Sequence, residues 1–427
     1  MSHRIVIVGG GAGGLELATA LGNKLHGPDV QVVLVDSSLT HIWKPLLHEV
    51  AAGVLDSAQE SLSYAAQAKW NHFRFVCGRM EGLDRRRRVI RLVGWVGKVS
   101  QLETPPVELA YDTLVVAVGS VGNDFGAPGV AEHCIFLDST AQAESLRENL
   151  LERHMSHRSQ GITDPLRIVI VGGGATGVEL AAELFDANRR LSYYHQTSKE
   201  GIEDLSVILV EAGPTLLPAL PGRIGSSVRK ELEDMGIRVR TGMAVKRAEA
   251  DGLFAADGNK IAADVMVWAA GVCAPAFLRG IDGLESSRSG QLVVTSTLQT
   301  TRDPDIFAFG DCAACPVEPG ATQNVAALAQ AAHQQASLLV RNLQLRLAGK
   351  PLQTFRFKDN GTLVSLASRN TFGRVFGNRI IEGRLARFFY VSLYRMHESA
   401  LYGPWRTLRR MLGSVLTRSS RPLLKLH

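Results

Sequence analysis

Two glycine-rich turns are the residues of this sequence that most directly predict chemistry. Each turn follows a strand-like run of Ile and Val and precedes a helix-like segment. The glycines have the spacing Gly-x-Gly-x-x-Gly, and they are Gly9, Gly11 and Gly14 in the first turn and Gly172, Gly174 and Gly177 in the second. Glycine at these positions allows a tight turn and lets the backbone approach a pyrophosphate closely. The pyrophosphate is then held at a helix N-terminus.

An acidic residue closes the next predicted strand after each turn. Asp36 ends the first of these strands, and Glu211 ends the second. A carboxylate at this place accepts hydrogen bonds from the ribose of a dinucleotide. Because a carboxylate repels a 2′-phosphate and no Arg directly follows Glu211, we expect the second site to prefer NADH to NADPH. One fingerprint is weak evidence, but two in this context predict a flavoprotein that also binds a nicotinamide cofactor.

The order of predicted strands and helices indicates an α/β protein with two Rossmann-like dinucleotide-binding domains. We expect residues 1–120 to form the first part of an FAD-binding domain and residues 121–285 to form an inserted NADH-binding domain. Residues 286–347 then return to the FAD-binding domain. Residues 348–427 form a third, C-terminal region that starts as strand and ends as helix.

Further strand ends complete the expected cofactor contacts. Gly119 and Gly271 lie in small-residue turns after apolar strands, and Asp311 follows Gly310 at the end of a third strand. We expect Asp311 to hydrogen-bond the ribityl hydroxyls of a flavin. The simpler alternative is an N-cap for the helix-prone stretch that follows, and the two roles are compatible. Gly13, inside the first glycine turn, is a further expected contact of the cofactor.

Glu179 lies one turn into the helix predicted after the second glycine turn. This position is expected to face the cleft between the two cofactors, where a carboxyl group can shape the nicotinamide site or relay a proton. The alternative is a purely local role, because a carboxylate in the first turn of a helix is favourable through the helix dipole alone.

Two glutamines lie four residues apart in the predicted helix that starts near Ala329. Gln330 and Gln334 therefore share one helix face. Alone, this pattern is only a good helix surface. Because the helix follows Asp311, the face can line the flavin, with Ala329 and Gln330 as contacts, and the two amides can hold a quinone head group.

Cys312 and Cys315 form a Cys-x-x-Cys pattern next to Asp311, which is a spacing that redox-active cysteines use. Flavin disulfide reductases, however, place their redox pair on the helix after the first glycine turn, and that helix has no cysteine here. Zinc would need two further ligands at suitable spacing, and none is evident. We therefore expect structural thiols and no metal site.

Composition and charge narrow the class of protein. The chain has 427 residues, a net charge of +6 and five cysteines, an odd number that favours a reducing compartment. The first strand begins too early for a signal peptide, and no apolar run is long enough to span a bilayer.

The C-terminal segment carries the excess of positive charge. From Ser399 to the C-terminus there is no acidic residue, whereas six arginines and lysines occur. An apolar stripe at three- and four-residue steps is interleaved with arginines, and its members are Trp405, Leu408, Met411, Leu412, Val415 and Leu416. This pattern is typical of a helix that lies on an anionic membrane surface. The alternative is a core-packing or dimer helix with solvated arginines.

The whole chain resembles the bacterial type II NADH dehydrogenases, which are single-subunit, non-pumping NADH:quinone oxidoreductases. Besides both fingerprints, the resemblance rests on the segments 40–47, 308–316 and 329–334. The runs Ile381–Phe388 and Ser392–His397, and the final Leu-Lys-Leu-His, are similar to the proteobacterial branch. One departure is the polar stretch from Asn188 to Asp204, which we expect to be a surface loop.

The resemblance implies noncovalent FAD, NADH as electron donor, a membrane quinone (ubiquinone or menaquinone) as acceptor and often a homodimer. It implies peripheral attachment to the cytoplasmic face of the inner membrane through C-terminal helices, and no role for nucleic acid. It carries catalytic roles to Glu179, Gln330 and Gln334, and it places Lys44, Pro45 and Leu46 beside the flavin.

Two rival functions remain open from the sequence. A sulfide:quinone oxidoreductase shares the fold and the membrane habit, but its chemistry needs two cysteines that flank the flavin, and the cysteines here lie in other contexts. A redox sensor that signals through nucleotide occupancy belongs to a different class of protein. A sensor is expected to hold reduced flavin, whereas an oxidoreductase passes the electrons to quinone.

Overall fold

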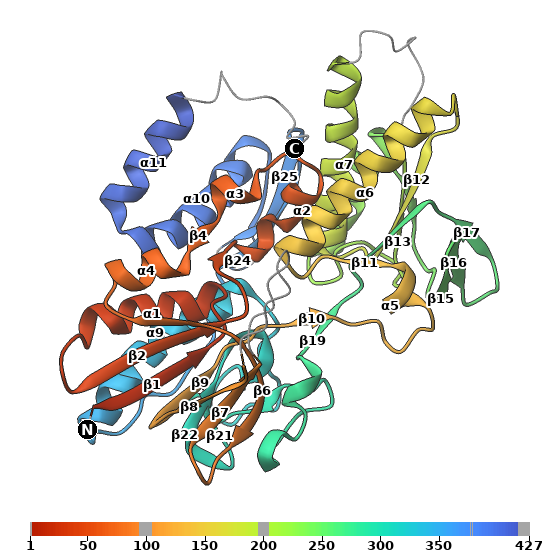
Figure 1. The fold of residues 1–427 in the computed structure, drawn as a ribbon. Coiled ribbons are helices and arrows are strands. Elements are labelled where there is room, and N and C mark those ends of the chain that lie inside the picture. Colours follow the sequence, from red (N-terminus) through yellow and green to blue (C-terminus); the bar gives the residue numbers. More distant parts are fainter. Residues whose placement is uncertain (1, 94–104, 195–204, 376, 378, 417–427) are drawn as a thin grey trace.

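The computed structural model describes residues 2–93, 105–194, 205–375, 377 and 379–416, and side chains are described outside 191–194 and 414–416. Two parallel sheets lie beside each other, and a third, smaller region packs across them (Figure 1). The mixed α/β architecture with two Rossmann-like units and C-terminal helices agrees with the sequence prediction.

The first sheet has six strands in the order β21-β22-β9-β1-β2-β5. Its members are β1 (His3–Val8), β2 (Val30–Asp36), β5 (Arg74–Cys77), β9 (Thr113–Val116), β21 (Gln299–Thr300) and β22 (Asp303–Ala308). All neighbours are parallel except β21 and β22. Ile5 to Val8 are almost completely buried, which explains why β1 is a continuous apolar run: a parallel strand is covered on both faces.

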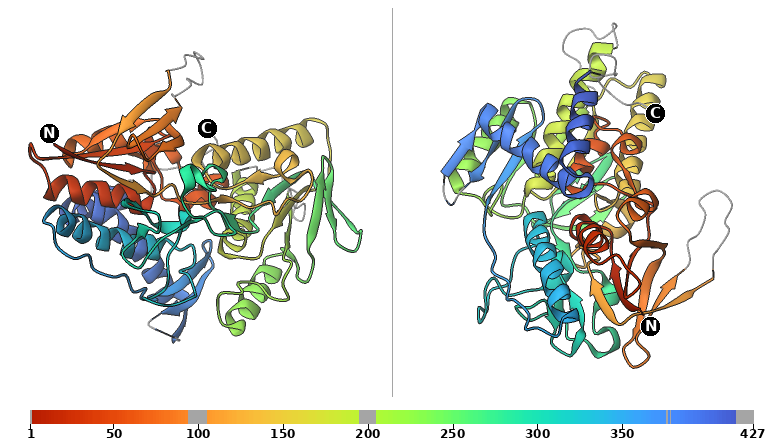
Figure 2. Two further views of the ribbon diagram at one scale, coloured as in Figure 1. Left: turned by 90° about the horizontal axis from the view of Figure 1, so that it is seen from below. Right: turned by 90° about the vertical axis from the view of Figure 1, so that its left-hand side faces the viewer.

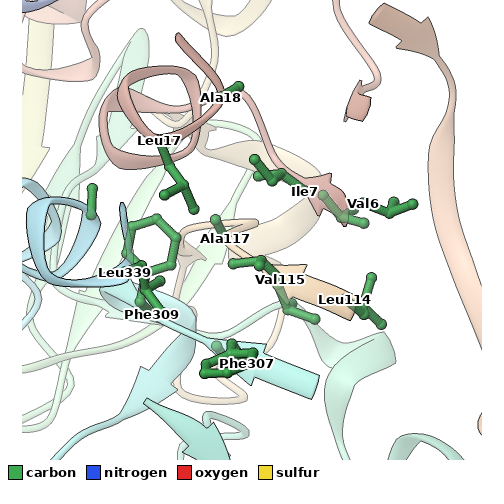
Figure 3. Close-up of a cluster of buried hydrophobic side chains, with 14 of the residues drawn as sticks. Val6, Ile7, Leu17, Ala18, Leu114, Val115, Ala117, Phe307, Phe309 and Leu339 are labelled. Atoms are coloured by element: carbon green, nitrogen blue, oxygen red, sulfur yellow. The ribbon is translucent and has the colours of Figure 1, made fainter. Parts of the chain in front are cut away.

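Helices α1 (Ala12–Lys24) and α9 (Ala329–Leu347) pack side by side against this sheet. Figure 3 shows Leu17 of α1, Leu339 of α9 and Phe307 of β22 converging with strand residues in one apolar cluster. The same cluster extends to an antiparallel sheet formed by β6 (Arg79–Asp84), β7 (Val89–Val93) and β8 (Val107–Ala110). Segments about 300 residues apart in sequence therefore share one core.

The second sheet is entirely parallel, in the order β11-β18-β12-β13-β14. Its members are β11 (Ile135–Phe136), β12 (Leu166–Val171), β13 (Leu205–Val210), β14 (Arg238–Arg240) and β18 (Val265–Trp268). The accompanying helices are α5 (Val130–His133), α6 (Thr140–Ser159), α7 (Ala175–Tyr194) and α8 (Gly222–Asp234). An antiparallel sheet of β15 (Val245–Glu249), β16 (Gly252–Ala255) and β17 (Lys260–Ala262) completes the unit.

The polar stretch after Asn188 is not a loop throughout, and that expectation was wrong in its first part. Helix α7 continues to Tyr194, so residues 188–194 are helical. These seven residues add about two helical turns, and the Arg190–Asp186 ion pair supports the start of this extension. Residues 195–204 lie outside the described part of the chain.

Two crossing segments join the sheets. Strands β10 (Val121–Gly122) and β19 (Val272–Cys273) pair with each other in antiparallel fashion, and they carry the chain from the first unit to the second and back (Figure 1). Short elements fill the remaining connections. They are β3 (Thr40–His41), α2 (Leu47–Ala51), α3 (Ser57–Glu60), β4 (Leu62–Ser63), α4 (Tyr64–Trp70), β20 (Leu292–Val293), β23 (Ala313–Ala314) and the 3₁₀ turns Lys44–Leu46, Ala276–Leu278, Ile281–Gly283 and Gly310–Cys312.

The C-terminal region starts as an antiparallel sheet and ends as two helices, as the sequence predicts. The sheet consists of β24 (Gly361–Leu366), β25 (Asn370–Val375) and β26 (Arg379–Glu382). Helix α10 (Gly383–Tyr402) packs on this sheet, and α11 (Pro404–Leu416) packs on α10. Both helices lie at the upper left in Figure 1, and α11, in dark blue, faces the viewer in the right-hand view of Figure 2. Among the described residues, no helix is long and apolar enough to span a bilayer. The predicted C-terminal Leu-Lys-Leu-His motif lies outside the described residues.

Candidate functional site

The first glycine turn connects β1 to α1, and its glycines have distinct roles. Gly9 has φ +105°, and a Cβ added there would lie 2.3 Å from the carbonyl oxygen of Ala117. A Cβ on Gly14 would lie 1.9 Å from the carbonyl oxygen of Gly9. At Gly11 nothing lies within 4 Å, so the backbone there borders open space. The turn therefore needs two glycines for its own packing and leaves the third position accessible to a ligand.

The second turn, between β12 and α7, repeats this geometry. Gly172 has φ +116°, a Cβ on Gly177 would lie 2.0 Å from its carbonyl oxygen, and nothing lies within 4 Å of a Cβ on Gly174. Gly13 of the first turn has no such freedom, because a Cβ there would lie 2.5 Å from the Phe309 ring. Gly13 therefore sits where the helix meets the core.

Each glycine turn donates a backbone hydrogen bond to the acidic residue at the end of the next strand. The Asp36 carboxylate accepts hydrogen bonds from the backbone N–H of Gly10 at 2.6 Å and of Ser38 at 2.8 Å. The Glu211 carboxylate accepts from the N–H of Gly173 and of Gly213, both at 2.6 Å. Both carboxylates thus lie beside their glycine turn, where ribose hydroxyls of a dinucleotide can reach them.

The residues present fit an anionic dinucleotide. Gly11 is the N-cap of α1, and within this fully described helix no side chain caps the first turn. Its first N–H groups are therefore available to a pyrophosphate at the positive end of the helix. Burial raises the pKa of the Asp36 carboxyl, although its backbone hydrogen bonds oppose that effect. Such a group prefers the polar hydroxyls of a ribose to an apolar neighbour.

A second set of expected cofactor residues comes together around Ser120. Its hydroxyl donates to the Asp311 carboxylate at 2.8 Å, and its carbonyl oxygen accepts from Lys44 Nζ at 3.0 Å. Lys44 also forms an ion pair with Asp138 at 3.1 Å. Pro45 and Leu46 lie in the same 3₁₀ turn as Lys44, and Gly119 directly precedes Ser120 with φ +69°. Gly271 has φ +119° and receives the Asn123 N–H at its carbonyl oxygen.

Gln335 fixes the Gly310–Asp311 turn, and sequence reasoning missed it. Its Oε1 accepts a hydrogen bond from the Gly310 N–H at 2.8 Å, and the side chain is buried. Gln335 directly follows Gln334, so it points about 100° away from the face that Gln330 and Gln334 share. The four-residue spacing of those two glutamines therefore gave no indication of the role of Gln335. It lies on a different face of α9, toward the core.

Gln330 and Gln334 both bind the backbone that leads into β24. Gln330 donates to the Gly361 carbonyl at 3.2 Å and accepts from the Asn360 N–H at 3.1 Å. Gln334 donates to the Lys358 carbonyl at 2.8 Å and accepts from its N–H at 3.0 Å. The two amides thus hold residues 358–361 against the first turns of α9, the helix that begins at Ala329.

Glu179 is buried against the other end of the same strand. Its Oε1 accepts a hydrogen bond from the Ser365 N–H at 3.0 Å, and the residue is 7% exposed. Strand β24 therefore contacts Gln330 at Gly361 and Glu179 at Ser365. Four residues of extended chain span about 13 Å. The structure thus brings Glu179 and Gln330 to one strand of the C-terminal region, and Gln334 binds Lys358 just before that strand.

The Glu179 carboxyl is neutral at pH 7. Burial raises its pKa to about 8, and a hydrogen bond from Ser365 only partly offsets this. His48 Nδ1 lies 3.8 Å from Glu179 Oε2, but burial lowers the pKa of His48 to about 4. Because both groups are then uncharged at neutral pH, their contact is not an ion pair.

Further carboxyl groups lie near Glu179 along α7 and on α2, and this row was not predicted from the sequence. Glu183 and Asp186 follow on the same face of α7, and Glu49 of α2 lies close by. Burial raises the pKa of Glu183 to about 8 and that of Glu49 to about 7. Their i, i+4 and i+7 spacing was visible in the sequence, but the covering region that buries them was not.

Cys312 and Cys315 are buried free thiols. Cys312 Sγ lies 3.2 Å from the Phe309 carbonyl oxygen, and Cys315 Sγ lies 3.5 Å from that of Pro316. Burial raises the pKa of each thiol to about 12, so the nucleophilic thiolate is strongly disfavoured. Burial in the apolar core supports the expectation that these are structural thiols.

Fold and site together define an oxidoreductase with two dinucleotide sites of the same construction. Residues 3–336 match the model of the pyridine nucleotide-disulphide oxidoreductases. The type II NADH:quinone oxidoreductase of Haemophilus influenzae is 44% identical over 99% of both chains. That of Staphylococcus saprophyticus is 27% identical over 90% of this chain and 92% of its own. NDH2 from Plasmodium falciparum, solved in complex with NADH, has a TM-score of 0.83 at 18% identity and full coverage of both chains. The chain therefore belongs to the pyridine nucleotide-disulphide oxidoreductase family and, within it, to the type II NADH:quinone oxidoreductases.

Proposed function

We propose that this chain oxidises NADH and reduces a membrane quinone by two electrons, with FAD as cofactor and without proton pumping. The repeated geometry of the two glycine turns, each bound by a strand-end carboxylate, is the observation that carries this proposal. It provides two dinucleotide sites in one chain, and the relatives supply the identity of the donor and the acceptor.

FAD is assigned to the first turn and NADH to the second. Asp36 and Glu211 bind the respective ribose hydroxyls, and Lys44, Pro45, Leu46, Gly119, Gly271, Gly310 and Asp311 line the flavin. When bound, FAD accepts a hydride from NADH and delivers two electrons to quinone. The chain would contribute by orienting the nicotinamide and flavin rings toward each other, a role that needs no side-chain nucleophile.

The quinone is assigned to the space beside the first turn of α9. Gln330 and Gln334 fix the segment 358–361 there. Ala329 and Gln330 are assigned as contacts of the flavin. The segment from Trp43 to Leu46 is assigned as a second wall of this quinone site. Trp43 stacks on His397 and Tyr394 of α10, which connects this wall to the C-terminal helices.

Glu179 is assigned to proton supply. Oxidation of NADH with reduction of quinone to quinol consumes one proton from solution in each turnover. A carboxyl group with a pKa of about 8 holds a proton at neutral pH, and Glu183 and Glu49 with similar pKa values can reload it. The raised pKa values are the support for this role.

Peripheral attachment to an anionic membrane surface is assigned to α10 and α11, on the cytoplasmic face of the inner membrane. Leu385, Phe388 and Met396 of α10 are exposed apolar side chains, as are Trp405, Leu408 and Leu412 of α11. A homodimer remains part of the proposal from the family resemblance. So do the domain limits 1–120, 121–285, 286–347 and 348–427.

Anaerobic stopped-flow absorbance of the purified, detergent-solubilised holoprotein tests the function. We expect NADH to bleach the flavin absorbance rapidly and a short-chain quinone to restore it. Bleaching by sulfide but not by NADH would assign the chain to sulfide oxidation instead. Bleaching by NADH without recovery on quinone addition would contradict the assigned acceptor.

A further inference from the structure

A hollow lined by arginines and aromatic rings lies where the last two helices meet. It has a volume of about 480 Å³, and its lining residues are Trp70, Tyr402, Arg406, Arg409 and Arg410. Trp70 comes from the end of α4, whereas the other four residues surround the bend between α10 and α11. The hollow thus joins the FAD-binding unit to the C-terminal helices.

The aromatic rings hold the guanidinium groups at the rim of this hollow. The Arg406 guanidinium lies 5.3 Å from the centre of the Trp70 ring, and that of Arg410 lies 5.0 Å from the centre of the Tyr402 ring. Guanidinium groups over aromatic faces are partly desolvated and fixed in orientation. They therefore lose less entropy when they bind an anion than free side chains would.

Positive charge exceeds negative charge around the hollow. Glu398, which is 2% exposed, is a carboxylate that contacts one of the lining arginines. Glu398 forms ion pairs with Arg395 at 2.5 Å and with Arg410 at 3.4 Å. The lining itself contains three arginines and no acidic residue. Within the described part of the chain, Arg406 and Arg409 form no ion pair with a carboxylate, which leaves a place for an external anion.

An exposed apolar face lies next to the arginines on the same helix. Trp405 is 76% exposed, Leu412 is 58% exposed and Leu408 is 44% exposed, whereas Thr407 on the opposite face is buried. At 100° per residue, Arg409 borders this apolar face, and Arg406 and Arg410 follow it around the helix. An apolar face beside a row of guanidinium groups matches the boundary between acyl chains and phosphates in a bilayer.

We propose that this hollow binds the phosphate group of an anionic phospholipid. Arg406 and Arg409 supply planar donor pairs to the phosphate oxygens, and Trp70 and Tyr402 contact the glycerol and upper acyl region. The occupant is a lipid rather than a soluble phosphate because the hollow opens beside the exposed apolar face of α11. This inference rests on the proposed membrane attachment and gives it a specific headgroup site.

Vesicle binding of the full-length holoprotein tests the proposal. We expect R406Q/R409Q to bind vesicles of phosphatidylcholine with 30% phosphatidylglycerol about 30-fold more weakly than wild type, since each basic residue strengthens adsorption about fivefold. Binding to pure phosphatidylcholine vesicles is expected to be weak and equal for both proteins. NADH oxidation with a soluble short-chain quinone in detergent is expected to stay unchanged.

Two further variants separate a built site from diffuse attraction. The control R86Q/R91Q removes the same charge from exposed arginines of the β6–β7 hairpin, far from α11 in Figure 1, and is expected to bind within twofold of wild type. The variant R406K/R409K keeps the charge but not the planar donors, so it is expected to recover less than half of the lost free energy of binding.

The outcomes are distinguishable. Equal losses in R406Q/R409Q and R86Q/R91Q, or full recovery in R406K/R409K, would overturn the headgroup site. Competition by 10 mM inorganic phosphate as effective as that by phosphatidylglycerol would show a free-phosphate site and would also overturn it. A wild-type protein that ignores both kinds of vesicle would refute the membrane attachment itself.

Discussion

The carboxylate of Glu16 accepts a hydrogen bond from His397 Nδ1 at 2.8 Å, although 381 positions separate the two residues. His333 Nδ1 donates to the other oxygen of Glu16 at 2.5 Å, and His397 Nε2 lies 3.1 Å from His41 Nε2. This network of four residues ties α10 to the helix that follows the first glycine turn. It lies next to that turn, because Tyr64, which contacts His41, donates to the Gly10 carbonyl at 2.7 Å.

We expect E16Q to destabilise the protein by about 1.5–3 kcal/mol, the range for hydrogen bonds to a charged group. Burial alone would raise the pKa of Glu16, but the two histidines outweigh it and lower the pKa, so this stability is lost as pH falls below about 4.5. The hydrogen bond to Glu16 raises the pKa of His333, so that contribution is complete below about pH 6.5 and is lost at higher pH. The wild-type-minus-variant difference in thermal stability is therefore expected to peak between about pH 4.5 and 6.5.

The half-exposed partner offers a matched control. H333Q keeps the pair between Glu16 and His397, so it is expected to cost less stability than E16Q. It is expected to remove only the part of the pH dependence in which stability falls above about pH 6.5. A pH-independent difference between E16Q and wild type would contradict the charged network.

Coenzyme preference tests the role of Glu211. In E211A/A212R the carboxylate is replaced by a neutral residue and a guanidinium group is added, so we expect kcat/KM for NADH to fall and that for NADPH to rise, each about tenfold. Steady-state kinetics with both coenzymes measures this, and E233A on α8 serves as the control for loss of an acid. If NADPH oxidation stays negligible, the assigned ribose contact is wrong.

The amides of α9 are expected to affect one half-reaction only. Q330L/Q334L removes the hydrogen bonds that hold residues 358–361, so we expect quinone reduction to slow about tenfold or more, while NADH still bleaches the flavin at the wild-type rate. Sequential-mixing stopped flow measures both steps, and Q344L on the same helix is the control. Equal loss of both half-reactions would refute the quinone assignment.

The pH profile tests Glu179. With a pKa of about 8, the wild-type carboxyl loses its proton as pH rises through 8, so quinone reduction is expected to fall there. We expect E179Q, which keeps the shape but has no acidic proton, to be about 100-fold slower and to lose this limb. An E179Q profile that still falls at pH 8 would assign the titration to another group.

The buried thiols predict a stability effect without a kinetic one. C312S/C315S places hydroxyl groups where apolar thiols pack, which is expected to cost about 1–3 kcal/mol for each site, with turnover per holoenzyme unchanged. C77S, at a half-buried position, is expected to cost much less. Lost turnover at unchanged thermal stability would mean that these cysteines take part in electron transfer.

Local pattern was sufficient to predict much of this molecule. The glycine turns, the strand-end acids and the apolar parallel strands follow from spacing and side-chain chemistry, because each is decided by neighbours within one strand–turn–helix unit. The fold class and the family follow from them.

Contacts between distant segments were not predictable in this way. Nothing near Glu16 indicates that His397 approaches it, and Gln335 shows its role only once Gly310 lies against α9. The spacing of Gln330 and Gln334 predicted a shared face, but their bonds to the backbone of 358–361 depend on where the C-terminal sheet packs. The continuation of α7 to Tyr194 likewise depends on tertiary support that a polar composition conceals.

Strand β24 makes the C-terminal region part of the candidate site and not only a candidate for membrane attachment. A terminal anchor that is only tethered to an enzyme can be cut off or exchanged for another without changing the chemistry. Here the same short strand touches Gln330 at one end and Glu179 at the other. Truncation after Leu347 would therefore keep both glycine turns but remove the contacts of β24 with Gln330 and with Glu179. Any replacement of the C-terminal region would have to retain this strand to keep both contacts.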